Sequence, residues 1–132
     1  MDTRRVDGEY NQIMNELIES EPDLAYIKNS NVRILALSSE HEKKSKYKTV
    51  YGQCEKVQEK YKWAIPSDFT ITVFEPNVVD FTEEQIRILL FHELLHVGVE
   101  QNDGSESYSI IPHDLEDFKI IIDRFGTSWS EV

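Results

Sequence analysis

Residues 82–96 read TEEQIRILLFHELLH, and this stretch decides most of what the sequence says about fold and chemistry. It opens on Thr82, with Gln85 three positions later, which is the pattern of a capping box at the start of a helix. Its apolar residues then recur at helical spacing, which predicts one face buried against a core. We therefore expect a long helix that continues to the turn signal Asn102-Asp103-Gly104.

The same stretch contains the motif His92-Glu93-Leu94-Leu95-His96. Positions i and i+4 lie on one face of a helix, so both imidazoles can reach one cation at the ~2.0–2.1 Å of a Zn–N bond. Glu93 lies roughly 100° around the helix from His92, where it suits a general base acting on a metal-activated water. This spacing is typical of a zinc hydrolase. In the alternative, the two histidines are buried and bind nothing, but Glu93 would then be a costly carboxylate beside neutral imidazoles.

A catalytic zinc site needs a third protein ligand besides His92 and His96. The best candidate is His113, because it falls near the start of a further predicted helix, Pro112 to Phe125, that could pack back across the first. Glu100 is a rival if the first helix continues far enough to place its carboxylate one turn beyond His96. Carboxylates close to His113 could orient a ligand histidine through a hydrogen bond, namely Asp114, Glu116 and Asp117.

The rest of the chain predicts a small α+β domain spanning residues 1–132, with residues 1–30 as an N-terminal helical extension. Helical spacing of apolar residues indicates a helix over Glu9–Ser20, which Pro22 prevents from continuing. Two short runs are typical of strands, Val32–Leu37 and Phe69–Phe74.

The segment between these strands is ambiguous. Apolar residues from Tyr47 to Tyr61 fit one face of a helix, whereas Gly52 and the β-branched Thr49 and Val50 weaken a helix. Pattern alone slightly favours the helix.

Composition narrows the function classes. The 132 residues include 14 basic and 25 acidic side chains, a net charge of −11, which disfavours binding to nucleic acid or anionic membranes. Cys54 is the single cysteine, which fits a reducing compartment and a small buried side chain better than a nucleophile. The N-terminal residues lack a secretory pattern and no apolar run is long enough to span a membrane. We expect a cytoplasmic protein, with the remaining histidine, His41, exposed in a polar loop.

Several stretches together resemble a known family, the putative phage metallopeptidases. The resemblance depends on the combination of H-E-L-L-H at 92–96 with P-H-D-L-E-x-F at 112–118. The other matching stretches are Tyr51–Val57, Asp68–Val73, Phe81–Phe91 and Phe125-Gly126.

The resemblance implies a zincin-like fold, in which a small mixed sheet packs on the helix that bears the motif and a C-terminal helix carries the third ligand. It implies that zinc is held by His92, His96 and His113, with Glu93 as the catalytic residue. It also implies that residues 52–59 form a strand, against the periodicity noted above.

The expected reaction is peptide-bond hydrolysis on a peptide or protein substrate, through a zinc-activated water with Glu93 as general base. A further donor to the oxyanion is not assigned, although Tyr108 is a candidate. The alternative is a non-catalytic, zinc-stabilised phage or prophage module for protein interaction. An open fourth coordination position distinguishes the enzyme from such a module, because structural zinc is usually closed by four protein ligands.

Overall fold

The structure, a computed structural model, describes residues 4–45 and 48–112 of the chain. Its strands are β1 (Arg4–Val6), β2 (Ile34–Ser39), β3 (Lys44–Ser45), β4 (Lys48–Thr49), β5 (Gly52–Lys56), β6 (Phe69–Phe74), β7 (Val97–Asn102) and β8 (Ser105–Ile110). Its α-helices are α1 (Gly8–Ser20), α2 (Ala25–Lys28) and α3 (Glu83–Leu94), and short 3-10 turns span η1 (Pro22–Leu24), η2 (Glu59–Tyr61) and η3 (Glu75–Asn77).

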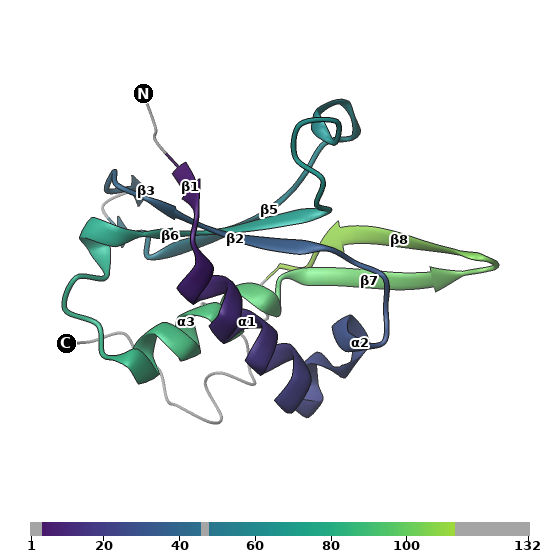
Figure 1. The fold of residues 1–132 in the computed structure, drawn as a ribbon, viewed down its shortest axis with the longest axis horizontal. Coiled ribbons are helices and arrows are strands. Elements are labelled where there is room, and N and C mark those ends of the chain that lie inside the picture. Colours follow the sequence, from purple (N-terminus) through teal and green to yellow (C-terminus); the bar gives the residue numbers. More distant parts are fainter. Residues whose placement is uncertain (1–3, 46–47, 113–132) are drawn as a thin grey trace.

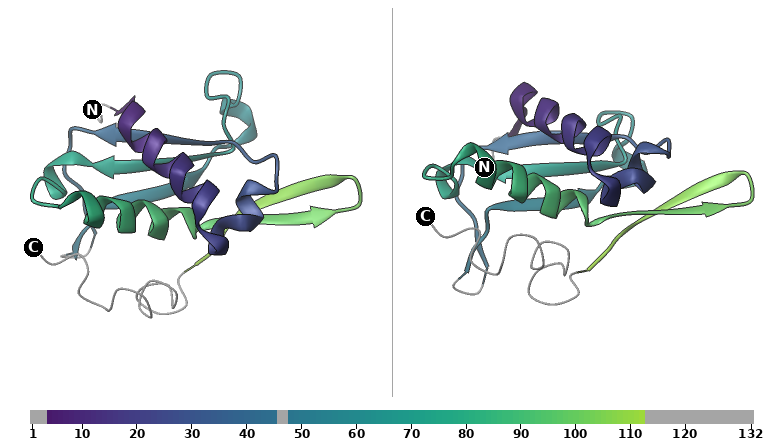
Figure 2. Two further views of the ribbon diagram at one scale, coloured as in Figure 1. Left: turned by 60° about the horizontal axis from the view of Figure 1, so that its bottom comes forward. Right: turned by 90° about the horizontal axis from the view of Figure 1, so that it is seen from below.

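A four-stranded mixed sheet forms the centre of the domain, in the order β1-β2-β6-β5. Strands β2 and β6 run parallel, and the two outer pairs run antiparallel. Helices α1 and α3 lie together on one face of this sheet, and the hairpin of β7 and β8 extends to one side (Figures 1 and 2). The expected mixed α+β architecture is therefore confirmed.

Helix α3 starts as predicted and ends earlier than predicted. Thr82 Oγ1 accepts a hydrogen bond from the Gln85 backbone at 3.2 Å, and Gln85 Oε1 accepts one from the Thr82 backbone at 2.8 Å. The predicted continuation to Asn102 is wrong, because the helix ends at Leu94 and the chain enters β7 at Val97. Residues 102–104 do form a turn, but it joins β7 to β8, with Gly104 at a φ of 76°. Glycine adopts this left-handed conformation without steric cost.

Most of the other predicted helices and strands are present in the structure. One predicted helix lies outside the described residues. Helix α1 and strands β2 and β6 occur where the pattern placed them, with β2 beginning two residues late. The ambiguous segment contains strand β5, so the strand that the family resemblance implies over residues 52–59 is confirmed for Gly52–Lys56, and the helical periodicity is wrong. The strand ends three residues earlier than expected, and Glu59 begins η2. The helix expected from Pro112 to Phe125 lies outside the described residues.

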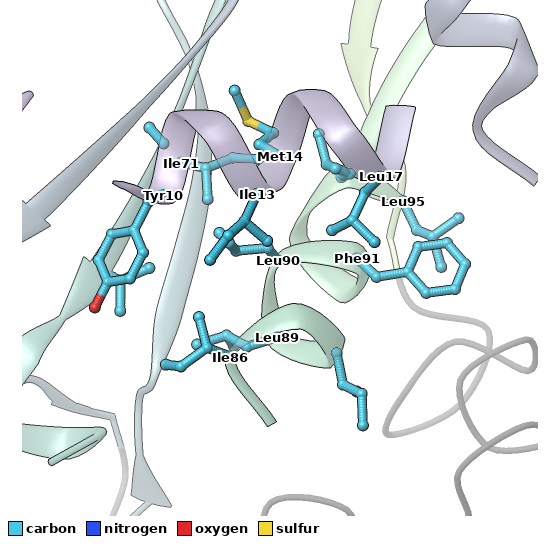
Figure 3. Close-up of a cluster of buried hydrophobic side chains, with 14 of the residues drawn as sticks. Tyr10, Ile13, Met14, Leu17, Ile71, Ile86, Leu89, Leu90, Phe91 and Leu95 are labelled. Carbon is cyan, nitrogen blue, oxygen red and sulfur yellow. The ribbon is translucent and has the colours of Figure 1, made fainter. Parts of the chain in front are cut away.

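The hydrophobic core lies between the two long helices and the sheet. Ile13 of α1 and Leu90 of α3 point toward one another, with Ile71 of β6 beside them (Figure 3). The N-terminal residues are part of this core, because Met14 is 1% exposed and Leu24 is fully buried. The segment expected to be an extension therefore supplies apolar surface to the same core as α3.

Polar contacts fix α1 against the sheet. Asp7 caps the helix by accepting a hydrogen bond from the Tyr10 backbone at 3.0 Å. The Asn11 side chain donates to the Ala36 carbonyl and accepts from the Ala36 backbone N–H, both at 2.9 Å. The Asp7 backbone N–H also donates to the Ala36 carbonyl, at 3.2 Å, and the Asn11 side chain satisfies the Ala36 N–H just beyond the pairing of β1 with β2.

The longest described helices, α1 and α3, have 13 and 12 residues. A membrane-spanning helix needs about 20 apolar residues. Within residues 4–45 and 48–112, no helix is long and apolar enough to cross a membrane.

Candidate metal centre

The C-terminal end of α3 brings the two motif histidines together. His92 lies in the last turn of the helix, and His96 follows in a tight turn whose backbone N–H donates to the Glu93 carbonyl at 3.1 Å. The two ring centroids are 5.3 Å apart, with an angle of 63° between the ring planes. For a metal bound at ~2.1 Å, a ring centroid lies about 3.2 Å from the ion, so two rings on a tetrahedral ion have centroids about 5.2 Å apart. The spacing of the pair therefore fits a shared zinc ion.

His96 is tied to the residue that follows strand β8. Its Nδ1 lies 2.6 Å from the Ile111 carbonyl oxygen, and the Ile111 backbone N–H donates to the His96 carbonyl at 2.7 Å. Because a carbonyl oxygen only accepts, Nδ1 carries the proton, and in the neutral ring Nε2 then has the lone pair. A hydrogen bond of this kind from the second ring nitrogen to a carbonyl is the usual support of a metal-binding histidine.

Glu93 is buried beside His92. The two residues are 5% and 9% exposed, and Glu93 Oε2 lies 3.9 Å from His92 Nε2. Strand β5 approaches the other side of Glu93 at Gly52, where an added Cβ would lie 3.3 Å from Glu93 Cγ and 3.3 Å from the Thr72 carbonyl oxygen. The glycine therefore allows the strand to pack directly on the stem of this carboxylate.

Of the two candidates for the third ligand, His113 and Glu100, the structure describes only Glu100. His113 lies outside the described residues, as do Asp114, Glu116 and Asp117. The idea that Glu100 coordinates from a continued helix is wrong, because Glu100 lies in strand β7, exposed and opposite Ser107. In the part of the chain that the structure describes, no group of three or more His, Cys, Asp or Glu side chains could hold a metal ion.

The structure describes the surroundings of two further residues considered from the sequence. The Tyr108 hydroxyl donates to Glu106 Oε1 at 2.8 Å within the hairpin, and burial together with this contact raises the pKa of Tyr108 to about 12. Burial, followed by the carboxylates of Glu93 and Glu55, raises the pKa of the Cys54 thiol far above its ordinary value. Cys54 is partly buried, and a raised pKa disfavours the thiolate form that a nucleophile needs.

Residues that support the pair were not apparent from sequence. The sequence pattern marks Gly52 only as a residue that weakens a helix, and it does not mark Ile111. An isolated glycine in a strand is a signal for close approach of another segment, so the strand that the family resemblance implies would mark Gly52 as such a position. The bond from Ile111 joins residues 15 positions apart, and no local pattern indicates it.

Replacing Gly98 by alanine is expected to destabilise the protein by about 1–3 kcal/mol, because the site has no room for a methyl group. An added Cβ would lie 2.8 Å from the Ser109 carbonyl oxygen and 3.0 Å from Ile111 Cγ1. Urea denaturation measures the effect. Gly8→Ala is the control, since a Cβ there meets nothing within 4 Å. Equal stabilities of the two variants would contradict this account of β7 packing.

Comparison with known proteins supports the assignment that the motif suggested. No curated protein and no solved structure gives a significant match. A family model, by contrast, matches residues 2–132, which is almost the whole chain and includes every element described above. The description of this family names a metallopeptidase, which is a peptidase that uses a metal ion. The chain belongs to the family named Putative phage metallopeptidase.

Proposed function

We propose that this chain is a zinc-dependent metallopeptidase that hydrolyses peptide bonds of a peptide or protein substrate. The observation that carries the proposal is the arrangement at the end of α3. Two imidazoles have the centroid spacing that a tetrahedral ion needs, and the buried Glu93 carboxylate lies 3.9 Å from one of their nitrogens. Membership of the metallopeptidase family supports the same conclusion from the whole sequence.

We assign His92, His96 and His113 as the zinc ligands. Support for His113 comes from chain connectivity, because Ile111 is hydrogen-bonded to His96 through both its N–H and its carbonyl. Consecutive Cα atoms are ~3.8 Å apart, so the Cα of residue 113 lies within about 7.6 Å of that of Ile111. The short covalent connection to Ile111, which contacts His96, supports the assignment of His113. The fold, in this proposal, is zincin-like, which the packing of α3 against a small mixed sheet supports.

In the proposed mechanism, Glu93 carries out the proton transfers of hydrolysis. When bound, a zinc ion supplies an acidified water and a Lewis acid for the scissile carbonyl oxygen. Glu93 acts as the general base and accepts the proton of the attacking water on its carboxylate, whose Oε2 lies 3.9 Å from His92 Nε2. The same carboxyl then donates this proton to the nitrogen of the leaving amine. Burial by α3 and β5 restricts the Glu93 stem, so its carboxylate is held beside His92 before substrate arrives.

The test begins with the metal. Protein purified without added metal is analysed for its elemental content, and its cleavage of an unfolded protein is measured before and after removal of metal with a chelator. We expect stoichiometric zinc, cleavage that the chelator abolishes, and recovery when zinc is returned. The His113→Ala variant is expected to lose both zinc and cleavage, since two histidines alone hold zinc weakly.

Each other outcome has a definite meaning. Absence of zinc and of cleavage in the wild-type protein would overturn the proposal. Full zinc content in His113→Ala would remove that residue from the ligand set. Zinc retained by a wild-type protein that cleaves nothing would instead favour the non-catalytic module for protein interaction.

A further inference from the structure

We propose that Tyr26, in the short helix α2, is a positioning residue for the zinc ligand His96. The inference rests on the proposed function, in which His96 binds zinc. Its evidence is a contact between segments about 70 positions apart in the sequence. The Tyr26 hydroxyl donates to the Val97 carbonyl oxygen at 2.6 Å and makes a longer contact, 3.4 Å, with the Leu94 carbonyl oxygen.

The two carbonyls lie on either side of the turn that carries His96. Leu94 is the last residue of α3, and Val97 is the first residue of β7. The last carbonyls of a helix have no partner within the helix and need a donor from elsewhere. By contacting both carbonyls, one phenol fixes the point at which the chain leaves the helix and enters the strand. The conformation of that turn determines where the His96 side chain starts.

The hydroxyl is suited to act as a permanent donor. Burial, followed by the nearby Cys54, raises the pKa of Tyr26 to about 12. The proton therefore stays on the hydroxyl throughout the neutral range. Tyr26 itself is only partly buried, and its ring packs against the edge of the core beside β7, which keeps the hydroxyl in place.

His96 is thus held from two directions. Ile111 binds its ring nitrogen and its backbone carbonyl, whereas Tyr26 binds the backbone on both sides of it. Helix α2 lies close to the start of β7 (Figures 1 and 2). The sequence pattern predicts no role for the N-terminal segment. In this proposal, the segment supports the metal centre through Tyr26.

The experiment compares Tyr26→Phe with Tyr10→Phe. Both changes remove only a hydroxyl that donates one short hydrogen bond, since Tyr10 donates to Glu75 Oε1 at 2.8 Å. Tyr10 lies in α1 and makes no contact of this kind with the metal centre. Zinc affinity is measured by competition with a chromophoric chelator. We expect Tyr26→Phe to weaken zinc binding about fivefold to tenfold and Tyr10→Phe to leave it unchanged.

A second readout does not need metal. Long-range 1H–15N spectra of the metal-free protein report the tautomer of His96, which we expect to be the Nδ1–H form in the wild type and in Tyr10→Phe. Tyr26→Phe is expected to shift these resonances toward a mixture of tautomers.

The outcomes separate this proposal from the proposed function. If wild-type protein binds zinc and Tyr26→Phe binds it within twofold as tightly, the positioning role is overturned while the zinc site stands. If wild-type protein binds no zinc, the proposed function fails, and the His96 resonances alone decide on Tyr26. If the His96 resonances change in Tyr26→Phe but not in Tyr10→Phe, the result would then support the proposal that Tyr26 positions His96. Unchanged His96 resonances in Tyr26→Phe would overturn that proposal.

Discussion

Replacement of Glu93 by glutamine is expected to lower kcat by about 10²–10⁴-fold while zinc content stays at the wild-type level. Glutamine keeps the size and shape of the side chain, so packing against Gly52 is preserved. Its amide cannot accept a proton from the attacking water, and the reaction loses its general base. Because Glu93 is assigned no bond to zinc, the metal should remain. Steady-state cleavage of an unfolded protein and elemental analysis of the same sample measure both effects.

Glu100→Gln is the matched control for this variant. It makes the same chemical change on an exposed residue of β7, opposite Ser107. We expect full activity and full zinc content, which would also exclude Glu100 as a ligand. Activity of Glu93→Gln within about fivefold of wild type would remove the general base from the mechanism. Loss of zinc in Glu93→Gln would instead mean that the carboxylate is a ligand.

The start of α3 and the metal pair could be predicted because the signals are local. A capping box needs residues three positions apart, and a histidine pair on one helical face needs residues four apart. The end of the helix was predicted wrongly, although a local signal existed. Asp103-Gly104 between alternating apolar residues is a strong indication of a two-residue hairpin. It was interpreted as the end of a helix because the apolar stripe of α3 continues to Val97.

The helical interpretation of the segment around β5 failed because its apolar residues have different surroundings. Tyr51 packs against Phe81, Val57 is buried in the loop after the strand, and Tyr61 is 49% exposed. These residues do not share one face, so their helical spacing had no structural meaning. Tertiary contacts decided the outcome, as they often do for short segments of mixed propensity.

The residues that support the metal pair could not be predicted for a different reason. The Tyr26 hydroxyl binds a backbone carbonyl of a distant residue, and Ile111 contacts His96 through its own backbone atoms, so no local sequence pattern marks either contact. A tyrosine in a short helix is usually a core or surface residue. Only the path of the chain, which brings α2 and the end of β8 to the same turn, makes these residues part of the site.

Leu90→Ala is expected to lower the free energy of unfolding by about 2–5 kcal/mol, the largest effect on stability among the changes considered. Leu90 is fully buried between α1 and the sheet, where Ile13 and Ile71 surround it (Figure 3). Removing its side chain loses the transfer free energy of three carbon atoms and leaves a cavity that rigid neighbours cannot fill. Urea denaturation, with the slope of the transition checked against wild type, measures the change.

Val79→Ala is the control, because Val79 is 79% exposed and its truncation should change stability by no more than about 0.5 kcal/mol. The comparison also tests how the metal centre is supported. Leu90 lies on the helix two residues before His92, so its packing against α1 fixes the helix that carries the pair. A loss below about 1 kcal/mol for Leu90→Ala would mean that α3 is held to the domain by something other than this core.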